Sequence, residues 1–377
     1  MFPTEFHIRK LQIRPNVVLA PMEGVTDLPF RRLVRHIGGV GLTCTEFIAA
    51  SALKLGRGKM WETAQFDTDE RPISIQIYGK NPQEMADAAR VVQDMGADIC
   101  DINMGCPSKK VCARSGGSAL MREPELAIDI VKAVRAAIEI PLTVKMRSGF
   151  DQGNRNAAEL AYLCQEEGAE AVTIHWRTRE DRYSGVRQVD RIAAAVDRLQ
   201  IPVVGNGDII DLASAKAMFG DTGCAGIMIG RGAIRNPWLA LQISRWQAGM
   251  PDLTVKSEEK KRIMLRYYDA IYTRLDQHEK GTMGRMKMLA KHFTIDLPHG
   301  KAFQGHLLHA QTRQEMLDWV DSYFSCLKDF ESGDSEAFSG TAFLKVPPRK
   351  PRNKSKSQNT VPATSKGSGY PCDSQPA

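Results

Sequence analysis

Between residues 16 and 232, eight short apolar or β-branched runs alternate with longer polar or amphipathic stretches. The runs are NVVLAP (16–21), VGLTCTEF (40–47), ISIQIYG (73–79), DICDIN (98–103), LTVKMR (142–147), AVTIHW (171–176), PVVGNGD (202–208) and GIMIGRG (226–232). Most intervals carry apolar residues three and four positions apart, the spacing of an amphipathic helix, as in 81–96, 123–138 and 154–168. Continuous apolar strands that alternate with helices predict a parallel sheet covered by helices.

Eight such units over this length predict an α/β fold of the (β/α)₈ TIM-barrel type. A doubly wound open sheet is the alternative, and it would place phosphate-binding glycines directly after its first strand. The first run here ends in APMEGVTD, which contains no GxGxxG motif. The barrel is therefore the preferred prediction, with residues 1–250 as the catalytic domain.

The pattern changes after the eighth run. Residues 251–332 carry helical periodicity in the stretches 258–275, 284–293 and 314–327, which predicts a small all-helical C-terminal domain. From residue 333 to 377 the chain is rich in Ser, Pro, Lys, Gly and Asn. Such a segment buries too little apolar surface to offset its ordering entropy, so we expect a disordered, low-complexity basic tail.

The composition, 42% hydrophobic and 25% charged over 377 residues, is that of an ordinary globular protein. No apolar run approaches the roughly 20 residues that span a bilayer, and the first 15 residues lack the apolar core of a signal peptide. We therefore expect a cytoplasmic protein without a membrane partner. The eight cysteines form no CxxC pair and no Cys/His ligand spacing, which argues against disulfides and a metal site.

The net charge of +7 is concentrated at one end of the chain. Residues 345–377 hold seven Lys/Arg and one acid, a charge of +6, which leaves +1 for residues 1–344. A polyanion would therefore have to contact local patches or the tail. The tail is either a weak RNA tether or a solubilising extension, and composition does not decide between them.

Polar groups follow every one of the eight predicted strands. The active site of a barrel lies at the carboxyl ends of its strands. Gln76, Lys145 and His175 even lie inside otherwise apolar runs, which packing alone does not explain, so we predict one shared polar pocket. The strand ends are Pro21, Met22 and Glu23; Glu46; Gln76 and Tyr78; Asn103 and Cys106; Lys145 and Arg147; His175 and Arg177; Asn206 and Asp208; Gly230 and Arg231.

Glycine-bearing loops follow the seventh and eighth runs, VVGNGDI and GIMIGRGAIRNP. Glycines let backbone N–H groups approach an anion, and Arg231 opens a helical segment whose N-terminus favours negative charge. Each loop alone could be a glycine-rich turn with a surface arginine. Together, at the two positions where barrels often bind phosphate, they predict a phosphate site.

Lys145 and Cys106 carry the candidate chemistry. A lysine inside a barrel strand needs an anionic or electron-rich partner, and the pyrimidine edge of a flavin fits; the alternative is a lysine that extends to the rim. Cys106 follows the fourth run, and basic neighbours would lower its thiol pKa and ease proton transfer. We favour a proton donor over a packed thiol, on a loop continued by the flexible segment RSGGSALM; the basic neighbours are Lys109, Lys110 and Arg114.

The motifs, in this order, resemble those of the bacterial tRNA-dihydrouridine synthases, nearest to the subgroups that modify D-loop positions 16 and 17. The resemblance covers roughly residues 14–330. It is carried by LAPMEGVTD, TEF, IQIYG, DINMGCPSKKV, RSGGSALM, VKMRSG, HWRTR, NGDI and MIGRGAIRNPW. Two departures are Trp176, where the family usually has Gly, and LAKHF, where many members have Arg-Lys-His.

The resemblance implies an FMN-dependent enzyme that takes electrons from NADPH (or NADH) and reduces the C5–C6 double bond of a tRNA uridine. Hydride would pass from flavin N5 to C6, and Cys106 would give the proton to C5. We expect a monomer with tRNA as partner. The implied flavin-binding residues are Pro21, Met22, Glu23, Gln76, Lys145, His175, Asn206, Gly207, Asp208, Gly230 and Arg231, and the implied uracil-binding residues are Asn103, Arg147, Arg177 and Tyr183.

Other interpretations stay open at this point. The basic residues of the helical region either hold RNA or form a solvated helix face; they are Arg285, Lys287, Lys291 and His292. The whole chain could also be another FMN-dependent barrel oxidoreductase that acts on a small pyrimidine or an enone. A third reading is a non-enzymatic RNA-binding protein, against which the intact set of strand ends argues.

Overall fold

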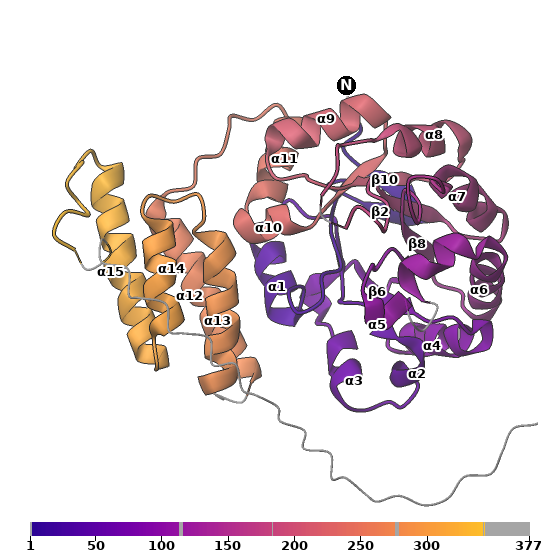
Figure 1. Cartoon of the computed structure of the whole chain (residues 1–377), viewed down its shortest axis with the longest axis horizontal. Coiled ribbons are helices and arrows are strands. Elements are labelled where there is room, and N and C mark those ends of the chain that lie inside the picture. The colour runs from indigo at the N-terminus through magenta and orange to yellow at the C-terminus, as the bar shows by residue number, and fades with distance from the viewer. Residues whose placement is uncertain (1, 113–115, 183, 276–278, 342, 344–377) are drawn as a thin grey trace, which may run out of the picture. The chain divides into compact units, whose positions relative to one another are not determined.

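The computed structural model describes residues 2–112, 116–182, 184–275, 279–341 and 343. In these residues eight parallel strands form a closed barrel (Figure 1). Each strand pairs with the next along the chain, and β11 pairs back to β3. The strands are β3 Val17–Leu19, β4 Leu42–Cys44, β6 Ile73–Tyr78, β7 Ile99–Met104, β8 Leu142–Arg147, β9 Ala171–His175, β10 Val203–Asn206 and β11 Gly226–Ile229. These are the eight predicted runs, so the predicted (β/α)₈ barrel is confirmed.

Successive side chains along each strand point to opposite faces of the sheet, so they pack into two different hydrophobic clusters. Ile102, Val144 and Ile174 belong to a large cluster that includes helix residues, so they face outward. Ile99, Ala171, Val204 and Met228 belong to a second cluster that contains no helix residue, so they face the barrel interior. Asn103, Lys145 and His175 share the parity of this inner set, nearer the carboxyl ends. The strand period therefore turns these polar groups inward.

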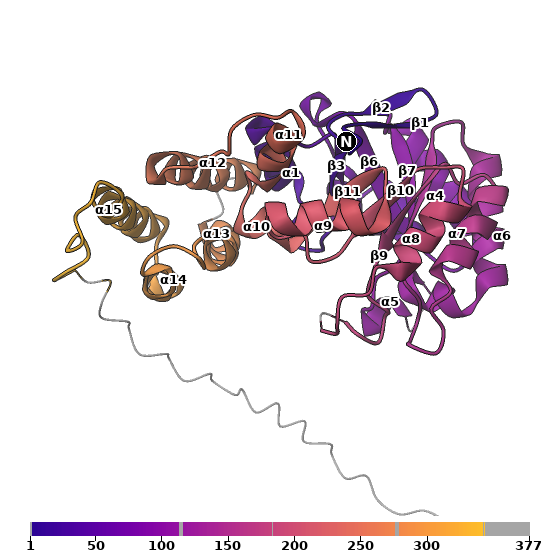
Figure 2. The same ribbon diagram turned by 90° about the horizontal axis from the view of Figure 1, so that it is seen from above.

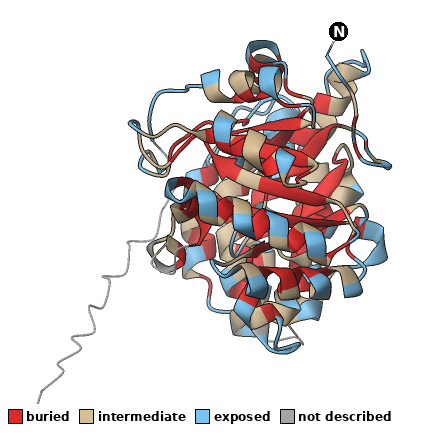
Figure 3. Ribbon diagram, turned by 90° about the vertical axis from the view of Figure 1, so that its right-hand side faces the viewer, coloured by how far each residue is buried: buried red, intermediate tan, exposed pale blue. Residues whose placement is uncertain are grey.

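Helices follow the strands and cover the barrel (Figure 2). Their inward faces are buried and their outward faces exposed (Figure 3). Asp27, Asn81 and Asp211 cap three of them, each side chain accepting from a backbone N–H three residues on. The helices are α1 Leu28–Ile37, α4 Pro82–Asp94, α6 Pro124–Ala137, α7 Ala157–Glu166, α8 Asp190–Arg198, α9 Leu212–Thr222 and α11 Leu239–Gln247.

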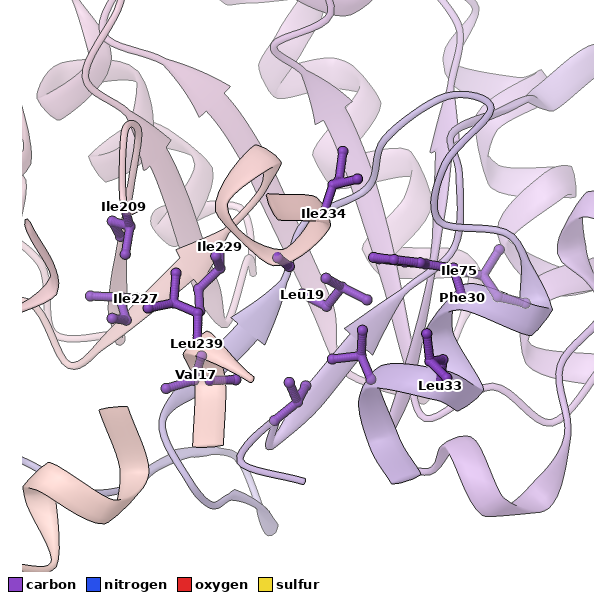
Figure 4. Packing of buried hydrophobic residues seen from close by; sticks show 14 of the residues in the cluster. Val17, Leu19, Phe30, Leu33, Ile75, Ile209, Ile227, Ile229, Ile234 and Leu239 are labelled. Carbon is purple, nitrogen blue, oxygen red and sulfur yellow. The ribbon is translucent and has the colours of Figure 1, made fainter. Parts of the chain in front are cut away.

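Shorter helical segments lie between these elements. They are α2 Ala50–Leu53, α3 Lys59–Ala64, α5 Lys109–Cys112, α10 Arg231–Arg235 and the 3₁₀ turns Thr68–Glu70 and Gly117–Arg122. Figure 4 shows apolar side chains of α1, α10 and α11 among those of β3 and β11, with Leu239 near Ile229 and Val17 and with Phe30 near Leu19. This packing fixes the loops that follow β3 and β11.

A β-hairpin that the sequence patterns did not predict precedes the barrel. Strands β1 (Phe6–Ile8) and β2 (Leu11–Ile13) pair antiparallel. Phe6, Ile8 and Ile13 are buried with the inner cluster of the barrel, so the hairpin closes the amino ends of the strands. The runs are too short for periodicity to reveal them. A second unpredicted strand, β5 (Ile48–Ala49), extends the sheet beside β6.

After the barrel, the described residues form four helices: α12 Ser257–Arg274, α13 Glu279–Phe293, α14 Gly300–His309 and α15 Arg313–Glu331 (Figure 1). The all-helical character is as predicted, but α14 lies outside the three predicted stretches. Phe303 of α14 stacks on Tyr323 of α15 with ring centroids 4.1 Å apart. None of the described helices has the length and apolar character that crossing a bilayer requires.

The chain remains packed beyond residue 332, where the sequence predicted the tail to begin. Phe338 and Phe343 are buried, and their rings contact Tyr323 at 5.8 and 5.7 Å between centroids. The burial of these two aromatic residues explains why the chain stays packed beyond the predicted boundary. The predicted tail from residue 344 onward lies outside the described residues.

The helical region and the barrel share contacts within one compact unit, residues 1–346. The Phe30 ring of α1 meets the Tyr267 ring of α12 edge-on, with centroids 6.0 Å apart. Arg285 of α13 forms an ion pair with Asp27, the residue that caps α1. The division at residue 250 therefore stays a prediction about domain organisation.

Candidate active site

A cavity of about 740 Å³ opens at the carboxyl ends of the barrel strands. Its size lies in the range of pockets that hold a small ligand or cofactor. The strand-end residues Glu46, Gln76, Tyr78 and Arg177 do not line it, and Tyr183 lies outside the described residues. The other predicted site residues all line it: Pro21, Met22, Glu23, Asn103, Cys106, Lys145, Arg147, His175, Asn206, Gly207, Asp208, Gly230 and Arg231.

Lys145 and His175 lie close together in the lining of this cavity. Strand register places Asn103 beside Lys145 and His175 beside Asn206. The Lys145 Nζ donates to Asn206 Oδ1 at 3.2 Å, and the Asn206 Nδ2 donates to the Met228 carbonyl at 2.7 Å. Burial lowers the pKa of Lys145 to about 8, with the nearby Arg147 charge acting in the same direction.

His175 is neutral at pH 7. Burial, and then the positive charges of Lys145 and Arg147, hold the pKa of this imidazole well below its ordinary value. A neutral imidazole can both donate and accept a hydrogen bond, whereas the neighbouring ammonium group only donates. The pair therefore offers a mixed donor and acceptor edge.

The Cys106 thiol lies in the cavity wall, half-buried. Burial raises its pKa, and the Ser108 N–H that bonds the sulfur opposes this only in part. The sequence predicted a lowered thiol pKa from basic neighbours. That prediction is wrong because desolvation outweighs the Arg147 charge; the Lys109 and Lys110 side chains and Arg114 lie outside what the structure describes. A thiol that keeps its proton is suited to donate it.

The described part of the segment RSGGSALM is more ordered than its sequence suggested. Residues Gly117–Arg122 form a 3₁₀ turn, with Ser118, Leu120 and Met121 buried. Ser118 donates twice to the Cys106 carbonyl, from its N–H at 3.1 Å and its hydroxyl at 2.9 Å. Gly117 has φ +60°, and a Cβ there would lie 2.9 Å from the same carbonyl. The Gly117–Arg122 turn therefore holds the Cys106 loop in place through the Cys106 carbonyl.

A chain of buried polar side chains supports the loop from the barrel interior. Asp101 accepts from Thr143 Oγ1 and from Gln76 Nε2, each at 2.5 Å. Gln76 Oε1 accepts from Asn103 Nδ2 at 2.6 Å. Asn103 Oδ1 in turn accepts from the Gly105 and Cys106 N–H groups at 3.0 and 2.9 Å. Gln76 was predicted to touch the flavin, but both ends of its amide are engaged in this chain.

Arg147 ties two loops together. Its Nε donates to the Gly105 carbonyl at 2.8 Å, and one Nη donates to the Thr178 carbonyl at 2.7 Å. The guanidinium is nearly buried, yet it also lines the cavity. Arg147 therefore holds the Cys106 loop against the loop after β9.

The predicted phosphate loops meet at a carboxylate. Asp208 accepts from Arg177 and from Arg231, which follow the neighbouring strands β9 and β11. Burial alone would raise the Asp208 pKa, but the two guanidinium groups lower it below its usual value. The helix that Arg231 opens, α10, has five residues, so the predicted helix N-terminus contributes little by itself.

Several cavity residues were missed by the sequence argument. Phe47 follows β4 and stands edge-on to Tyr78 with centroids 5.5 Å apart. Phe47, Arg179 and Arg182 could have been predicted as cavity residues, because they follow the carboxyl ends of β4 and β9. His292 reaches the cavity from α13, which no local pattern predicts.

Two of the four basic residues for which RNA contact and a solvated helix face were both open are engaged within the protein. Arg285 pairs with Asp27, and Lys287 Nζ donates to the carbonyls of Leu308 and Ala310 at 3.2 and 2.8 Å. Because these bonds already engage the two charged groups, Arg285 and Lys287 are weaker candidates for RNA contacts. Burial, and then nearby positive charge, lowers the pKa of His292, so it is neutral at pH 7.

Comparisons with known proteins agree with these motifs. The family model described as dihydrouridine synthase (Dus) matches residues 18–328. A probable tRNA-dihydrouridine synthase of Rhodobacter capsulatus is 42% identical over 69% of this chain and 81% of its own length. One of Rickettsia typhi is 41% identical over 70% and 81%, and tRNA-dihydrouridine synthase B of Pseudomonas syringae is 35% identical over 83% and 92%.

Proposed function

Because this chain belongs to the dihydrouridine synthase family, we propose that it reduces the C5–C6 double bond of a uridine in the D-loop of tRNA. Membership confirms the family predicted from the motifs, and with it the prediction of an oxidoreductase. We further propose FMN as the bound cofactor, NADPH or NADH as its reductant, and a cytoplasmic, monomeric enzyme.

The observation that carries this proposal is one cavity that joins an ammonium group, a neutral imidazole, a guanidinium and a protonated thiol. Lys145 and His175 suit the pyrimidine edge of a flavin, where negative charge gathers on reduction. The glycine-bearing loops and Arg231 suit its phosphate. Ala20, Met22 and Ile209 supply apolar wall for the ring system. The donor set therefore fits FMN.

When bound, FMN supplies hydride to C6 of the uracil. The protein must then deliver a proton to C5, and Cys106 is the acid in reach of the cavity. Its raised pKa keeps the proton on sulfur until the substrate takes it. Asn103 and Arg147 fix the loop that carries the thiol, and both also border the space for the base.

A uridine of folded tRNA must leave its stack to enter such a cavity. Arg179, Arg182 and His292 line the cavity wall and suit the nucleotide's phosphate and ribose. Phe47 offers an aromatic ring to the flipped base. We propose that the helices α12–α15 receive the rest of the tRNA.

The test compares two cysteine variants. Purified protein is incubated with FMN, NADPH and unmodified tRNA, and dihydrouridine is located by mass mapping. Cys106→Ala should bind FMN and tRNA normally but form product about 10²–10⁴-fold more slowly, because a general acid is lost. Cys326→Ala, which removes a half-buried thiol of α15 outside the cavity lining, should turn over normally.

Near-normal turnover by Cys106→Ala would discard the acid role. Wild-type protein that takes up no flavin would discard the function as a whole. Reduction of free uridine or of an enone, with no product in tRNA, would favour the alternative oxidoreductase.

A further inference from the structure

Three charged side chains form a row across the carboxyl ends of β9, β10 and β11. Arg177 donates to both carboxylate oxygens of Asp208, at 2.9 and 2.6 Å. Arg231 donates to Asp208 Oδ1 from the other side at 2.8 Å. The side chains are 5%, 35% and 51% exposed in this order, so the row runs from the protein interior to the cavity.

Arg177 occupies the buried end and does not line the cavity. Its Nε donates to the Ser184 carbonyl at 2.7 Å, and its guanidinium lies 4.0 Å from the centre of the Trp176 ring. A bidentate and stacked guanidinium has little freedom to turn toward a substrate. The position does not support a direct contact of Arg177 with uracil.

The backbone of Gly207 and Asp208 brings the carboxylate back to Arg177. Gly207 has φ +120° and Asp208 has φ +50°, so both lie in the left-handed region. A Cβ at Gly207 would lie 2.4 Å from the Trp176 ring, which leaves room for glycine alone. Trp176, the departure from the family pattern, therefore packs directly beneath this turn.

The charges decide what the row can bind. Asp208 and Arg231 both line the cavity, and as a pair they sum to zero. An unneutralised carboxylate there would repel an incoming phosphate and offset the Arg231 charge. Arg177 adds one positive charge from the side of Asp208 away from the cavity, so the three side chains together carry a net charge of +1. The nearby imidazoles of His175 and His292 are neutral at pH 7 and add nothing.

We propose that Arg177 is a positioning residue that neutralises Asp208, so that the positive charge of Arg231 is not cancelled where the phosphate of the flavin binds. This rests on the proposed FMN site. What matters for phosphate binding is the summed charge of Arg177, Asp208 and Arg231. Loss of the Arg177 charge should therefore be compensated by loss of the Asp208 charge.

The test measures the ratio of riboflavin to FMN dissociation constants, by quenching of flavin fluorescence in the deflavinated full-length protein. This ratio reports phosphate recognition and cancels effects on the ring site. Arg177→Gln should lower the ratio about tenfold, because the phosphate loses a charge-assisted contact. The double variant Arg177→Gln/Asp208→Asn restores the charge of +1 and should restore the ratio. Asn also tolerates the left-handed backbone at this position.

Arg262→Gln is the matched control, since it removes one arginine from an exposed ion pair with Glu259 on α12 and should leave the ratio unchanged. An unchanged ratio in Arg177→Gln, or a double variant that stays low, overturns the charge balance. If Arg177→Gln does not fold, Asp208→Asn alone decides, because a ratio at or above wild type supports the proposal and a fall overturns it. Equal binding of FMN and riboflavin by wild type would instead contradict the proposed cofactor.

Discussion

Lys145 is an ammonium group that the barrel interior solvates poorly, and its pKa of about 8 follows from that burial. If the flavin needs the charged form, its affinity is linked to this titration. The group is charged below pH 8 and neutral above it, so the affinity is full at low pH and declines as the pH rises. We predict a loss of affinity of up to tenfold per pH unit above pH 8, measured by flavin titration between pH 6.5 and 9.5.

Lys145→Arg is the control for this titration, because arginine stays charged over the whole range. Its affinity should vary little with pH, even if its absolute value is lower. Equal pH profiles for the two proteins would assign the titration to another group.

Gln76 tests the buried chain that leads to Cys106. Gln76→Leu removes the acceptor of Asn103 Nδ2 and a donor to Asp101, so Asn103 can rotate away from the Cys106 loop. We predict turnover about 10- to 100-fold slower with flavin affinity within about threefold of wild type, and a stability loss of roughly 1–3 kcal/mol from the unpaired buried groups. Unchanged single-turnover kinetics would show that the chain only stabilises the barrel.

Among the elements, α1 carries one of the contacts between the barrel and the C-terminal helices. Asp27 caps this helix and pairs with Arg285, yet burial raises its pKa despite that guanidinium. Burial of the charge therefore costs more than the ion pair returns. Asn caps as well as Asp and carries no charge.

We predict that Asp27→Asn changes the free energy of unfolding by less than about 0.5 kcal/mol at pH 7, whereas Asp27→Ala costs about 1 kcal/mol because the cap is lost. Urea unfolding measures both. As the pH falls from 7 toward 4, wild type should gain stability relative to Asp27→Asn, because the folded carboxyl takes up its proton first. A large loss in Asp27→Asn would mean that the ion pair dominates.

The whole molecule divides into the compact part, residues 1–346, and a basic segment after it. Residues 347–377 carry six Lys/Arg and one acid. A chain that ends at residue 346 should keep the stability of the full protein. A chain that ends at residue 332 loses buried Phe338 and Phe343 and should be less stable by about 3 kcal/mol or more.

The chain ending at residue 346 also tests the basic segment. If that segment binds tRNA, its removal makes the plot of log affinity against log salt shallower, since fewer counterions are released. Filter binding between 50 and 300 mM salt, in steps of about 50 mM, measures this slope. An unchanged slope would assign the segment a role other than RNA binding.

The sequence by itself determined the eight strands, the barrel and the family, because strand periodicity and motif order are local properties of the chain. It also predicted that Cys106, Lys145, His175 and Asn206 share one pocket, and all four line the cavity, since the strand ends of a barrel meet at one face. These positions needed no partner from elsewhere in the chain.

Only the tertiary structure decided which polar groups face the cavity and which lie behind it. Gln76 and Arg177 are strand-end residues like the others, but Asn103 and Asp208 engage them from neighbouring strands. The direction of the Cys106 pKa likewise depends on burial by distant segments. Register, burial and long-range charge pairs arise when separate strands meet, so a one-dimensional pattern does not contain them.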